Sequence, residues 1–255
     1  MLLNQTVALS LLLLPGFALA SPPTPETLQD IGPGLSQAVA HRAVDALYCA
    51  EEHGQEVDKL IVVDMSLKST TKRLWAFDLA GRKPRLVVNE LVAHGSGSDK
   101  DNDGYAERFS NTPDSNMTSL GLYAIGEKYQ GKHGWSRRLD GLFKLFNSKA
   151  RQRDVVLHSS DYVNPAHVGR SQGCPAIKPA TMTALEKAGL KNAVLWIDGP
   201  NADLARTVAD CASRYKTRHW HDMPEPWAGL ANPSSAITTV LWTSKQNEQS
   251  DWQGG

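Results

Sequence analysis

The sequence predicts a mainly β protein with peripheral helices. From residue 59 onward, short apolar or alternating segments follow one another, with turn residues such as Gly81 and Pro84 between them. Closely spaced strands separated by turns favour an antiparallel sheet over alternating β–α–β units. Stretches with helical spacing of apolar residues come before and after these segments, so we expect the helices at the periphery.

Residues 1–20 predict a secretory signal peptide. The apolar run Val7–Leu14 is too short to cross a bilayer, and the segment closes on Ala18-Leu19-Ala20, a small-residue cleavage pattern. A first strand or a buried helix is the alternative for this run. No later stretch is apolar enough for a membrane helix. We therefore expect a soluble protein that is exported to the periplasmic or cell-wall side.

The remaining segments can be assigned in chain order. Residues 21–33 are rich in proline and predict a linker, and residues 34–57 predict an N-terminal helical segment with an apolar stripe. Strands are expected at 60–63, 73–78, 86–94, 119–129, 155–157 and 193–197, and helices at 147–154, 179–189 and 202–215. The main domain is expected over 58–200, a C-terminal helix with an irregular extension over 201–242, and a disordered tail over 243–255.

Charge and cysteine content limit the possible partners. The chain has 27 basic and 27 acidic residues, so its charge gives no support for a nucleic-acid partner. An odd number of cysteines in an oxidising compartment leaves one free thiol or an intermolecular link. The simplest arrangement of the three cysteines pairs Cys49 with Cys211 and leaves Cys174 free. Two buried free thiols are the alternative.

A histidine and a cysteine between residues 155 and 179 have the clearest potential for chemistry. The apolar run at 155–157 leads into His158, and a polar turn with flanking glycine carries Cys174. An imidazole that accepts the proton of a thiol makes the sulfur a nucleophile for acyl transfer. The polar residues around Cys174 indicate an exposed turn, whereas structural cysteines usually lie in apolar runs.

Neighbouring residues fit the same chemistry. Gly173 has no side chain to hinder a substrate carbonyl, and the backbone N–H groups of Gly173 and Cys174 are candidates for an oxyanion hole. Ser159 is a candidate to orient His158, through its hydroxyl or its backbone carbonyl. A zinc site formed by His158, His167 and Cys174 would lack a fourth ligand, so we expect no metal and no other cofactor.

At these residues the chain resembles the L,D-transpeptidase family, cysteine enzymes that cross-link bacterial peptidoglycan. The family signature is a histidine followed, after a loop, by Ser/Thr-His-Gly-Cys, and His158 and Ser171-Gln172-Gly173-Cys174 occupy those places. The resemblance is greatest to the branch with Gly-Arg-Ser-x-Gly-Cys-Pro-Ala and covers residues 58–180. Gln172 replaces the usual second histidine, and Ala176 stands where Arg or Asn often follows the cysteine.

The resemblance implies a fold and a reaction. The fold would be an L,D-transpeptidase-like β-sandwich or mixed sheet over residues 58–200. Cys174 would form a thioester with a peptidoglycan tetrapeptide stem, release D-alanine and transfer the stem to an amine acceptor. An L,D-carboxypeptidase or a cleaving hydrolase would use the same pair of residues, and a non-catalytic wall-binding β module is a further alternative. The sequence indicates no oligomeric state.

Cationic residues near the cysteine are candidates for binding the carboxylates of stem peptides. Arg170, Ser171 and His133 are the expected substrate-binding residues. Surface charge is the simpler interpretation of the other cations in this region, which are Lys132, Arg137, Arg138, Arg151 and Arg153.

Residues 99–104 begin like a calcium-binding loop. Asp99, Asp101 and Asp103 alternate and Gly104 follows. The twelfth position is Ser110 instead of a bidentate Glu, and the flanks are not helical. The sequence therefore favours a solvated acidic loop over a calcium site.

Overall fold

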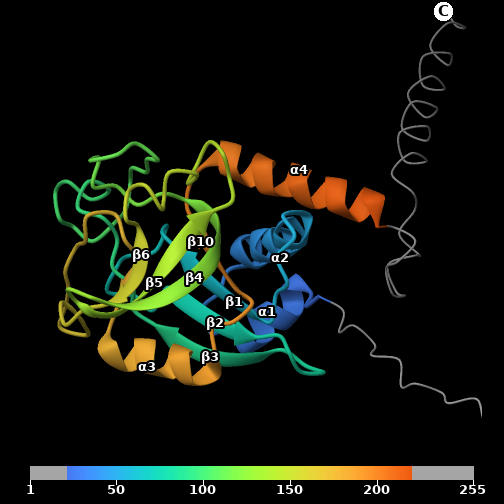
Figure 1. Ribbon diagram of the computed structural model, residues 1–255, viewed down its shortest axis with the longest axis horizontal. Coiled ribbons are helices and arrows are strands. Elements are labelled where there is room, and N and C mark those ends of the chain that lie inside the picture. Colours follow the sequence, from blue (N-terminus) through green and yellow to red (C-terminus); the bar gives the residue numbers. More distant parts are fainter. Residues whose placement is uncertain (1–21, 220–255) are drawn as a thin grey trace, which may run out of the picture.

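The computed structural model describes residues 22–219, and an eight-stranded mixed sheet forms its centre (Figure 1). The strands lie in the order β3-β2-β1-β10-β4-β5-β6-β9. Their bounds are β1 Lys59–Asp64, β2 Leu74–Asp78, β3 Arg85–Glu90, β4 Gly121–Gly131, β5 Gly134–Gly141, β6 Val156–Ser159, β9 Ala176–Ile177 and β10 Ala193–Asp198. A separate pair is formed by β7 Val163–Asn164 and β8 His167–Val168. The expected mainly β fold with a mixed sheet is confirmed.

Two pairings in the large sheet are parallel, which the strand spacing did not predict. β1 pairs with β10 and β6 pairs with β9 in parallel, and the other pairings of this sheet are antiparallel. A parallel pair needs a long crossover connection. The loop between β6 and β9 provides one crossover. β10 enters the sheet late in the chain, between β1 and β4, and so lies far in sequence from both neighbours.

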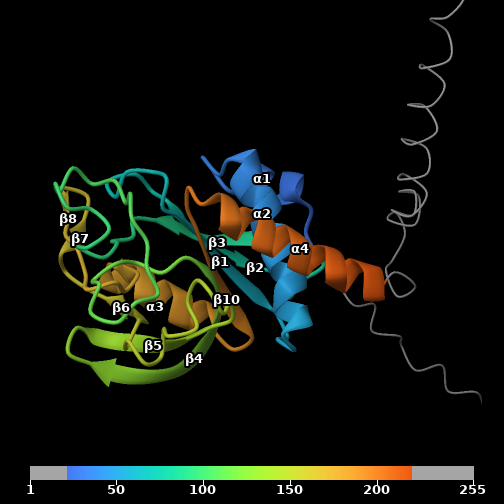
Figure 2. The same ribbon diagram turned by 90° about the horizontal axis from the view of Figure 1, so that it is seen from above.

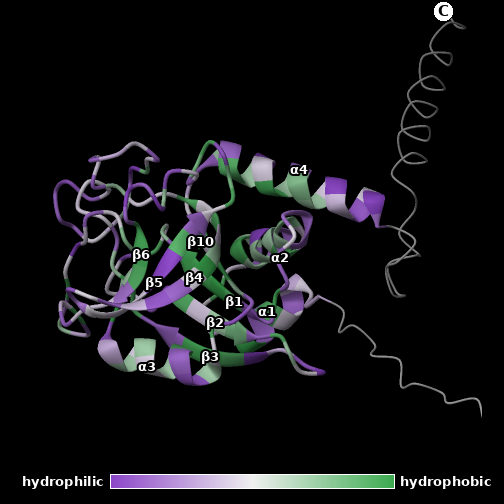
Figure 3. Cartoon of the chain, in the orientation of Figure 1, coloured by the Kyte–Doolittle hydropathy of each residue, from purple (hydrophilic) through white to green (hydrophobic). Residues whose placement is uncertain are grey.

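Residues 22–219 also form four helices around this sheet. They are α1 Pro25–Ile31, α2 Gln37–Glu52, α3 Pro179–Ala188 and α4 Ala202–Arg218. α2 packs on β10, β1 and β4 and contacts α1 and α4, whereas α3 packs on β3 and β6. In Figure 2, α1, α2 and α4 lie together on one side of the sheet, away from α3. β1, β2 and β10 are almost entirely buried, which explains why they read as continuous apolar runs. Figure 3 shows these strands as the hydrophobic centre of the molecule.

Two expected segments differ from the structure. Residues 21–33 were expected to be a linker but include α1, because Thr24 caps the helix, Pro25 occupies its first turn and Leu28 is fully buried. Residues 147–154 were expected to be helical but form turns, ending at Asp154 with a φ of 50°. The side chain of Asn147 bonds the Phe143 N–H and the Leu122 carbonyl instead of facing solvent along a helix.

Several expectations fall outside the described residues. They are the signal peptide at 1–20, the part of the C-terminal extension beyond residue 219, and the tail at 243–255. Within residues 22–219, no helix combines the length and the apolar composition needed to cross a bilayer.

The two edges of the large sheet are joined to each other. The segment after β3, residues 93–96, is called the seam segment below. Its Ala93 N–H donates to the Ala176 carbonyl of β9 at 2.8 Å, and Gly95 forms a bridge with Ser171. α3 contacts β3 at one edge and β6 beside the other edge, so the sheet curls around this helix. Residues 171–175, called the Cys174 turn below, therefore lie where the edges meet.

A disulfide connects the helices outside the sheet. Cys49 of α2 and Cys211 of α4 are bonded, with their Cα atoms 5.6 Å apart, and Cys174 is free. The expected pairing is confirmed. It ties the start of the described chain to its end.

Removing this disulfide should lower the free energy of unfolding. The bridge closes a loop of 162 residues, and loop-closure entropy assigns such a bridge at most about 5 kcal/mol. We expect the double variant Cys49→Ala/Cys211→Ala to unfold at a lower urea concentration than the wild type. Cys174→Ala, which keeps the bridge, is the control and should unfold near the wild-type midpoint. Equal midpoints for all three proteins would contradict a stabilising role.

Candidate active site

His158 and the Cys174 turn are held beside each other by a backbone ladder. His158 is a buried residue of β6, and β6 pairs in parallel with β9 so that His158 lies opposite Ala176. The His158 N–H donates to the Pro175 carbonyl at 3.3 Å. The residue after the cysteine is thus bonded directly to the backbone of the histidine. Two segments brought close by the register of the sheet therefore present the imidazole and the thiol.

The Cys174 thiol is partly exposed and rests on the beginning of β6. Its Sγ accepts the Val156 N–H at 3.4 Å and donates to the Asp154 carbonyl at 3.6 Å. Val156 precedes His158 by two residues, and residues two apart on a strand face the same side of a sheet. The sulfur therefore lies at the start of β6, two residues before His158 on the same strand.

Ser171 fixes the conformation of the turn from inside. Its Oγ donates to the Cys174 carbonyl at 2.7 Å and accepts the Gly173 N–H at 3.0 Å. The Gly173 N–H, expected in an oxyanion hole, is thus already bonded in this structure. Among residues 22–219 no acceptor faces the Cys174 N–H, so this group remains available to an oxyanion. The hydroxyl of Ser171 serves the turn, although the sequence suggested a contact with substrate.

Gly173 is required by the shape of the turn. Its φ is 119°, a conformation that residues with a side chain rarely adopt. A Cβ at this position would lie 2.8 Å from the Met117 carbonyl oxygen. A second glycine faces it, since a Cβ on Gly95 would lie 2.7 Å from the Gly173 Cα. The Cys174 turn therefore lies in close backbone contact with both neighbouring segments.

Ser159 orients the imidazole through its backbone carbonyl. His158 Nδ1 lies 3.0 Å from the Ser159 carbonyl oxygen, which can only accept, so Nδ1 carries the hydrogen. Nε2 is then the basic atom of the ring. The Ser159 hydroxyl donates to the His133 carbonyl at 2.8 Å, and the His133 ring lies 5.3 Å from the His158 ring, centroid to centroid. The Ser159 hydroxyl and the Ser159 carbonyl were both candidates to orient His158. The hydroxyl bonds to His133, and the carbonyl bonds to His158.

Burial keeps both groups uncharged at rest. Burial raises the pKa of the Cys174 thiol, and the Val156 N–H and the positive Arg153 partly oppose it. Burial also lowers the pKa of His158, and the bond to Ser159 partly opposes that change. The resting pair is therefore a neutral thiol and a neutral imidazole. Such a pair transfers its proton during attack and is not a preformed ion pair.

Arg153, which sequence reasoning treated as surface charge, lies against the Cys174 turn, with its Nη2 3.2 Å from where a Cβ on Gly173 would be. Its guanidinium donates to the carbonyls of Ser110 at 2.8 Å and Met117 at 2.7 Å. It thereby fastens residues 110–117 against the Cys174 turn, and its charge lowers the pKa of Cys174. No local pattern identified it, because its partners are backbone carbonyls about forty residues away.

The other cations are mostly neutralised within the fold. Arg170, expected to bind substrate, donates to the Asp99 carbonyl. Arg137 is paired with Glu186, Arg138 with Asp154, and Arg151 with Glu127 and Asp140. Lys132 is exposed and forms no salt bridge with any residue between 22 and 219. Among residues 22–219, Lys132 and His133 lie near His158 and form no salt bridge. They therefore remain candidates for binding a carboxylate of the substrate.

An open groove lies next to His158. It encloses about 590 Å³ and runs between the β4–β5 hairpin, the segment after β6 and the start of α3. His133, Trp135 and Tyr162 line it, together with the exposed carboxylate of Asp161. The rings of His133, His158 and Tyr162 lie 5.3 to 6.4 Å apart, so the groove ends against the histidine. The groove therefore lies next to the His158 ring.

Comparison with known protein families identifies the domain. The family model described as L,D-transpeptidase catalytic domain matches residues 32–197. The chain belongs to this family. The resemblance seen in the sequence is thereby confirmed, and the match includes both His158 and Cys174. Among curated protein sequences no match is found.

Solved structures give weaker similarities. The helical cell shape determining protein Pgp2 from Campylobacter jejuni is 10% identical over 73% of this chain and 66% of its own, with a TM-score of 0.42. An L,D-transpeptidase from Mycobacterium smegmatis is 12% identical over 56% of this chain and 59% of its own, with a TM-score of 0.35. One from Stackebrandtia nassauensis is 15% identical over 70% of this chain and 77% of its own, with a TM-score of 0.33. This chain therefore spans less than two thirds of the first two neighbours.

A buried group of three side chains lies behind the seam segment of this L,D-transpeptidase domain. Arg73 and His94 are fully buried and Asp99 is 1% exposed. Arg73 Nη2 lies 2.8 Å from His94 Nδ1, and His94 Nε2 lies 3.1 Å from Asp99 Oδ2. The sequence did not single out this group. A signal was present, because His94 ends an apolar run as His158 does, and a glycine-rich turn follows it.

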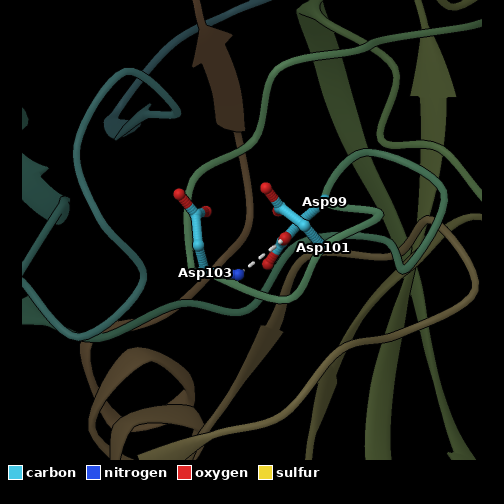
Figure 4. A group of neighbouring side chains, drawn as sticks. All are labelled: Asp99, Asp101 and Asp103. Carbon is cyan, nitrogen blue, oxygen red and sulfur yellow. Dashed lines mark hydrogen bonds between the residues drawn. The ribbon is translucent and has the colours of Figure 1, made fainter.

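Asp99 also belongs to the acidic loop that resembled a calcium site. Its carboxylate accepts the backbone N–H of Asp103 at 3.1 Å (Figure 4). It also accepts the Gly104 N–H at 3.1 Å, in addition to His94. Asp101 and Asp103 are exposed. The Asp103 carboxylate accepts the Tyr105 N–H at 2.8 Å, so two of the three carboxylates already accept hydrogen bonds within the fold. The loop is held by Asp99 through hydrogen bonds of the protein itself.

Gly173→Ala should disturb the turn more than its backbone penalty alone predicts. A positive φ costs a residue with a side chain about 1–3 kcal/mol, and here the Cβ would also meet the Met117 carbonyl. Gly189→Ala is the matched control, because Gly189 has a φ of 82° and nothing within 4 Å of the added Cβ. We expect urea unfolding to show a larger loss of free energy for Gly173→Ala. Equal losses would contradict the close contact.

The free energy of unfolding should fall as the pH is lowered from 6.5 to 4. Burial and the positive Arg73 lower the pKa of His94 from 6.5 to about 4. Between these two pH values the His94 side chain is protonated in the unfolded chain but stays neutral in the folded chain. This difference lowers the free energy of unfolding by about 3 kcal/mol in total. The lowered pKa of His158 acts in the same direction. Urea unfolding at pH 7, 5.5 and 4 measures the effect, and His94→Gln should show a shallower decline. An equal decline in both proteins would exclude His94 as a cause.

Proposed function

We propose that this protein is an exported cysteine acyltransferase that acts on peptidoglycan stem peptides, an L,D-transpeptidase. The observation that carries the proposal is the free Cys174 on a partly exposed turn bonded to the backbone of His158, whose Nδ1–H is tied to Ser159. The family to which the chain belongs supports the same reaction. The apolar segment at 1–20 supports export, which would bring the enzyme to its substrate.

The first half of the reaction forms a thioester. Cys174 Sγ leaves its contacts with residues 154 and 156 and transfers its proton to His158 Nε2 as it attacks the carbonyl carbon of the third stem residue. The Cys174 N–H donates to the oxyanion that forms. As the carbon–nitrogen bond to the terminal D-alanine breaks, the imidazolium returns the proton to the leaving amine.

The second half transfers the stem to an amine. The amine of a second stem attacks the thioester carbon, His158 takes a proton from this nitrogen, and the carbon–sulfur bond breaks. The thiolate then regains its proton from the imidazolium. Because His158 serves first as base and then as acid in each half, its neutral resting state suits both steps.

The groove beside His158 is the proposed place for the stem peptides. His133 lines it and stacks near His158, so we assign the contact with substrate to His133 and to the unpaired Lys132. Arg170 and Ser171 support the turn through the Asp99 carbonyl and the Cys174 carbonyl. Their expected contact with substrate stays a prediction.

A carbapenem should acylate the protein at Cys174. We expect intact mass spectrometry to show one adduct on the wild type and none on Cys174→Ala. His158→Gln should form the adduct at least about a hundredfold more slowly than the wild type, because the general base is lost.

His167→Gln is the control, since this exposed histidine lies on β8 outside the site. It should react at the wild-type rate. Absence of an adduct on the wild type would overturn the enzymatic proposal and favour a wall-binding module.

Hydrolysis is the second candidate outcome, because the thiol is partly exposed and the groove is open to solvent. Water attacking the same thioester would give an L,D-carboxypeptidase or a cleaving enzyme. Product analysis with purified tetrapeptide stems separates the two. Cross-linked dimers indicate transfer, and tripeptides without dimers indicate hydrolysis.

A further inference from the structure

The buried group formed by Arg73, His94 and Asp99 has a defined direction of hydrogen bonding. A guanidinium can only donate, so His94 Nδ1, at 2.8 Å from Arg73 Nη2, must be the accepting nitrogen. His94 Nε2 then carries the hydrogen and donates to Asp99 Oδ2 at 3.1 Å. The imidazole is therefore neutral, and its tautomer is set by a cation on one side and an anion on the other.

The remaining polar atoms of the group are bonded to backbone. Arg73 also donates to the Leu67 carbonyl at 2.6 Å and to the Val92 carbonyl at 3.2 and 3.0 Å. Asp99 accepts two further backbone N–H groups from its own loop. A buried charge that loses a partner is costly, so the group resists movement of any one member. It connects the start of β2 to the seam segment and to residues 99–104.

The seam segment in turn grips the Cys174 turn. The His94 carbonyl accepts the Ser171 N–H at 2.9 Å, and the Ser96 N–H donates to the Ser171 carbonyl at 2.8 Å. Ser171 then holds the two residues that matter for chemistry, through its contacts with Gly173 and Cys174. The His94 backbone is thus hydrogen-bonded to Ser171, and Ser171 is hydrogen-bonded to the backbone of Cys174. Two successive hydrogen-bonded contacts connect His94 to the residue that carries the sulfur.

We propose that Arg73, His94 and Asp99 are positioning residues that hold the seam segment as a rigid template for the Cys174 turn and so set the reactivity of the thiol. The proposal rests on the proposed function in one respect, the assignment of Cys174 as the nucleophile. None of the three side chains reaches the groove, so they act through Ser171 and do not touch substrate. Arg170, bonded to the Asp99 carbonyl from within the loop that precedes the turn, reinforces the same connection.

The test measures the thiol and the turn directly. With Cys49 and Cys211 in a disulfide, Cys174 is the free thiol, and its alkylation by iodoacetamide can be followed by mass. Hydrogen exchange of the Ser171 amide reports the bond to His94. For Asp99→Asn we expect alkylation about tenfold or more slower and faster exchange at Ser171.

Asp78→Asn is the matched control. Asp78 is also a mostly buried carboxylate with cationic partners, Lys59 and Arg85, but it lies at the opposite end of β2 from Arg73. It should alter overall stability without altering alkylation or exchange at the turn. Equal effects of the two variants, compared at conditions of equal folded fraction, would overturn the proposal.

A conservative pair at position 94 provides a second, independent variant test. The amide of His94→Gln can accept from Arg73 and donate to Asp99, whereas His94→Leu fills a similar volume without polar atoms. We expect His94→Gln to keep at least half of the alkylation rate and His94→Leu to fall with Asp99→Asn. Equal rates in the two variants would also contradict the proposal.

If these variants do not fold, the proposal can be tested by hydrogen exchange of the wild-type protein at different pH values. His94 is faced by Arg73, Asp99 and Arg170, and its pKa lies at about 4. Protonation places an N–H against the Arg73 guanidinium, so protection of the Ser171 amide should fall as the pH is lowered from 6 to 4, while amides of α2 keep theirs. Unchanged protection at Ser171 would overturn the proposal. None of these measurements needs substrate, so the proposal fails separately from the proposed function.

Discussion

The joining of the two sheet edges at residues 93–96 is the constraint on which the site depends. A sheet of eight strands leaves two edges with unpaired backbone groups. Here the edges meet through the Ala93 bond to Ala176, and the Cys174 turn is the piece of chain that completes the joint. Cys174 therefore lies on a loop in sequence but is held by hydrogen bonds on both sides, from β6 and from the seam segment.

This arrangement reconciles exposure with rigidity. A nucleophile must be reached by substrate, and loops that are exposed are usually mobile. In this domain Cys174 is partly exposed, while the backbone behind it packs closely, with Gly95 and Gly173 in contact. Polar groups supply the support: the half-buried Arg153 from one side and the buried group of Arg73, His94 and Asp99 from the other.

Much of the fold was predictable because its signals are local. The strand β10 and the helix α3 follow from an apolar run and from a Pro-to-Gly helical pattern, respectively. The disulfide followed from the odd number of cysteines. The errors also have local causes, since the prolines before α1 suggested a linker although one of them begins a helix. The parallel pairings could not be predicted, because they depend on which distant strand enters the sheet beside β1.

The sequence by itself determined the reactive types, a histidine after an apolar strand and a cysteine in a glycine-flanked turn, because strand and turn preferences act over a few residues. The tertiary structure alone decided which groups serve them. It brought Arg170 to the Asp99 carbonyl and Arg153 to the Met117 carbonyl, next to the Cys174 turn. These pairs are 71 and 36 residues apart, and a hydrogen bond to a backbone carbonyl leaves no mark in the side-chain pattern of the accepting residue.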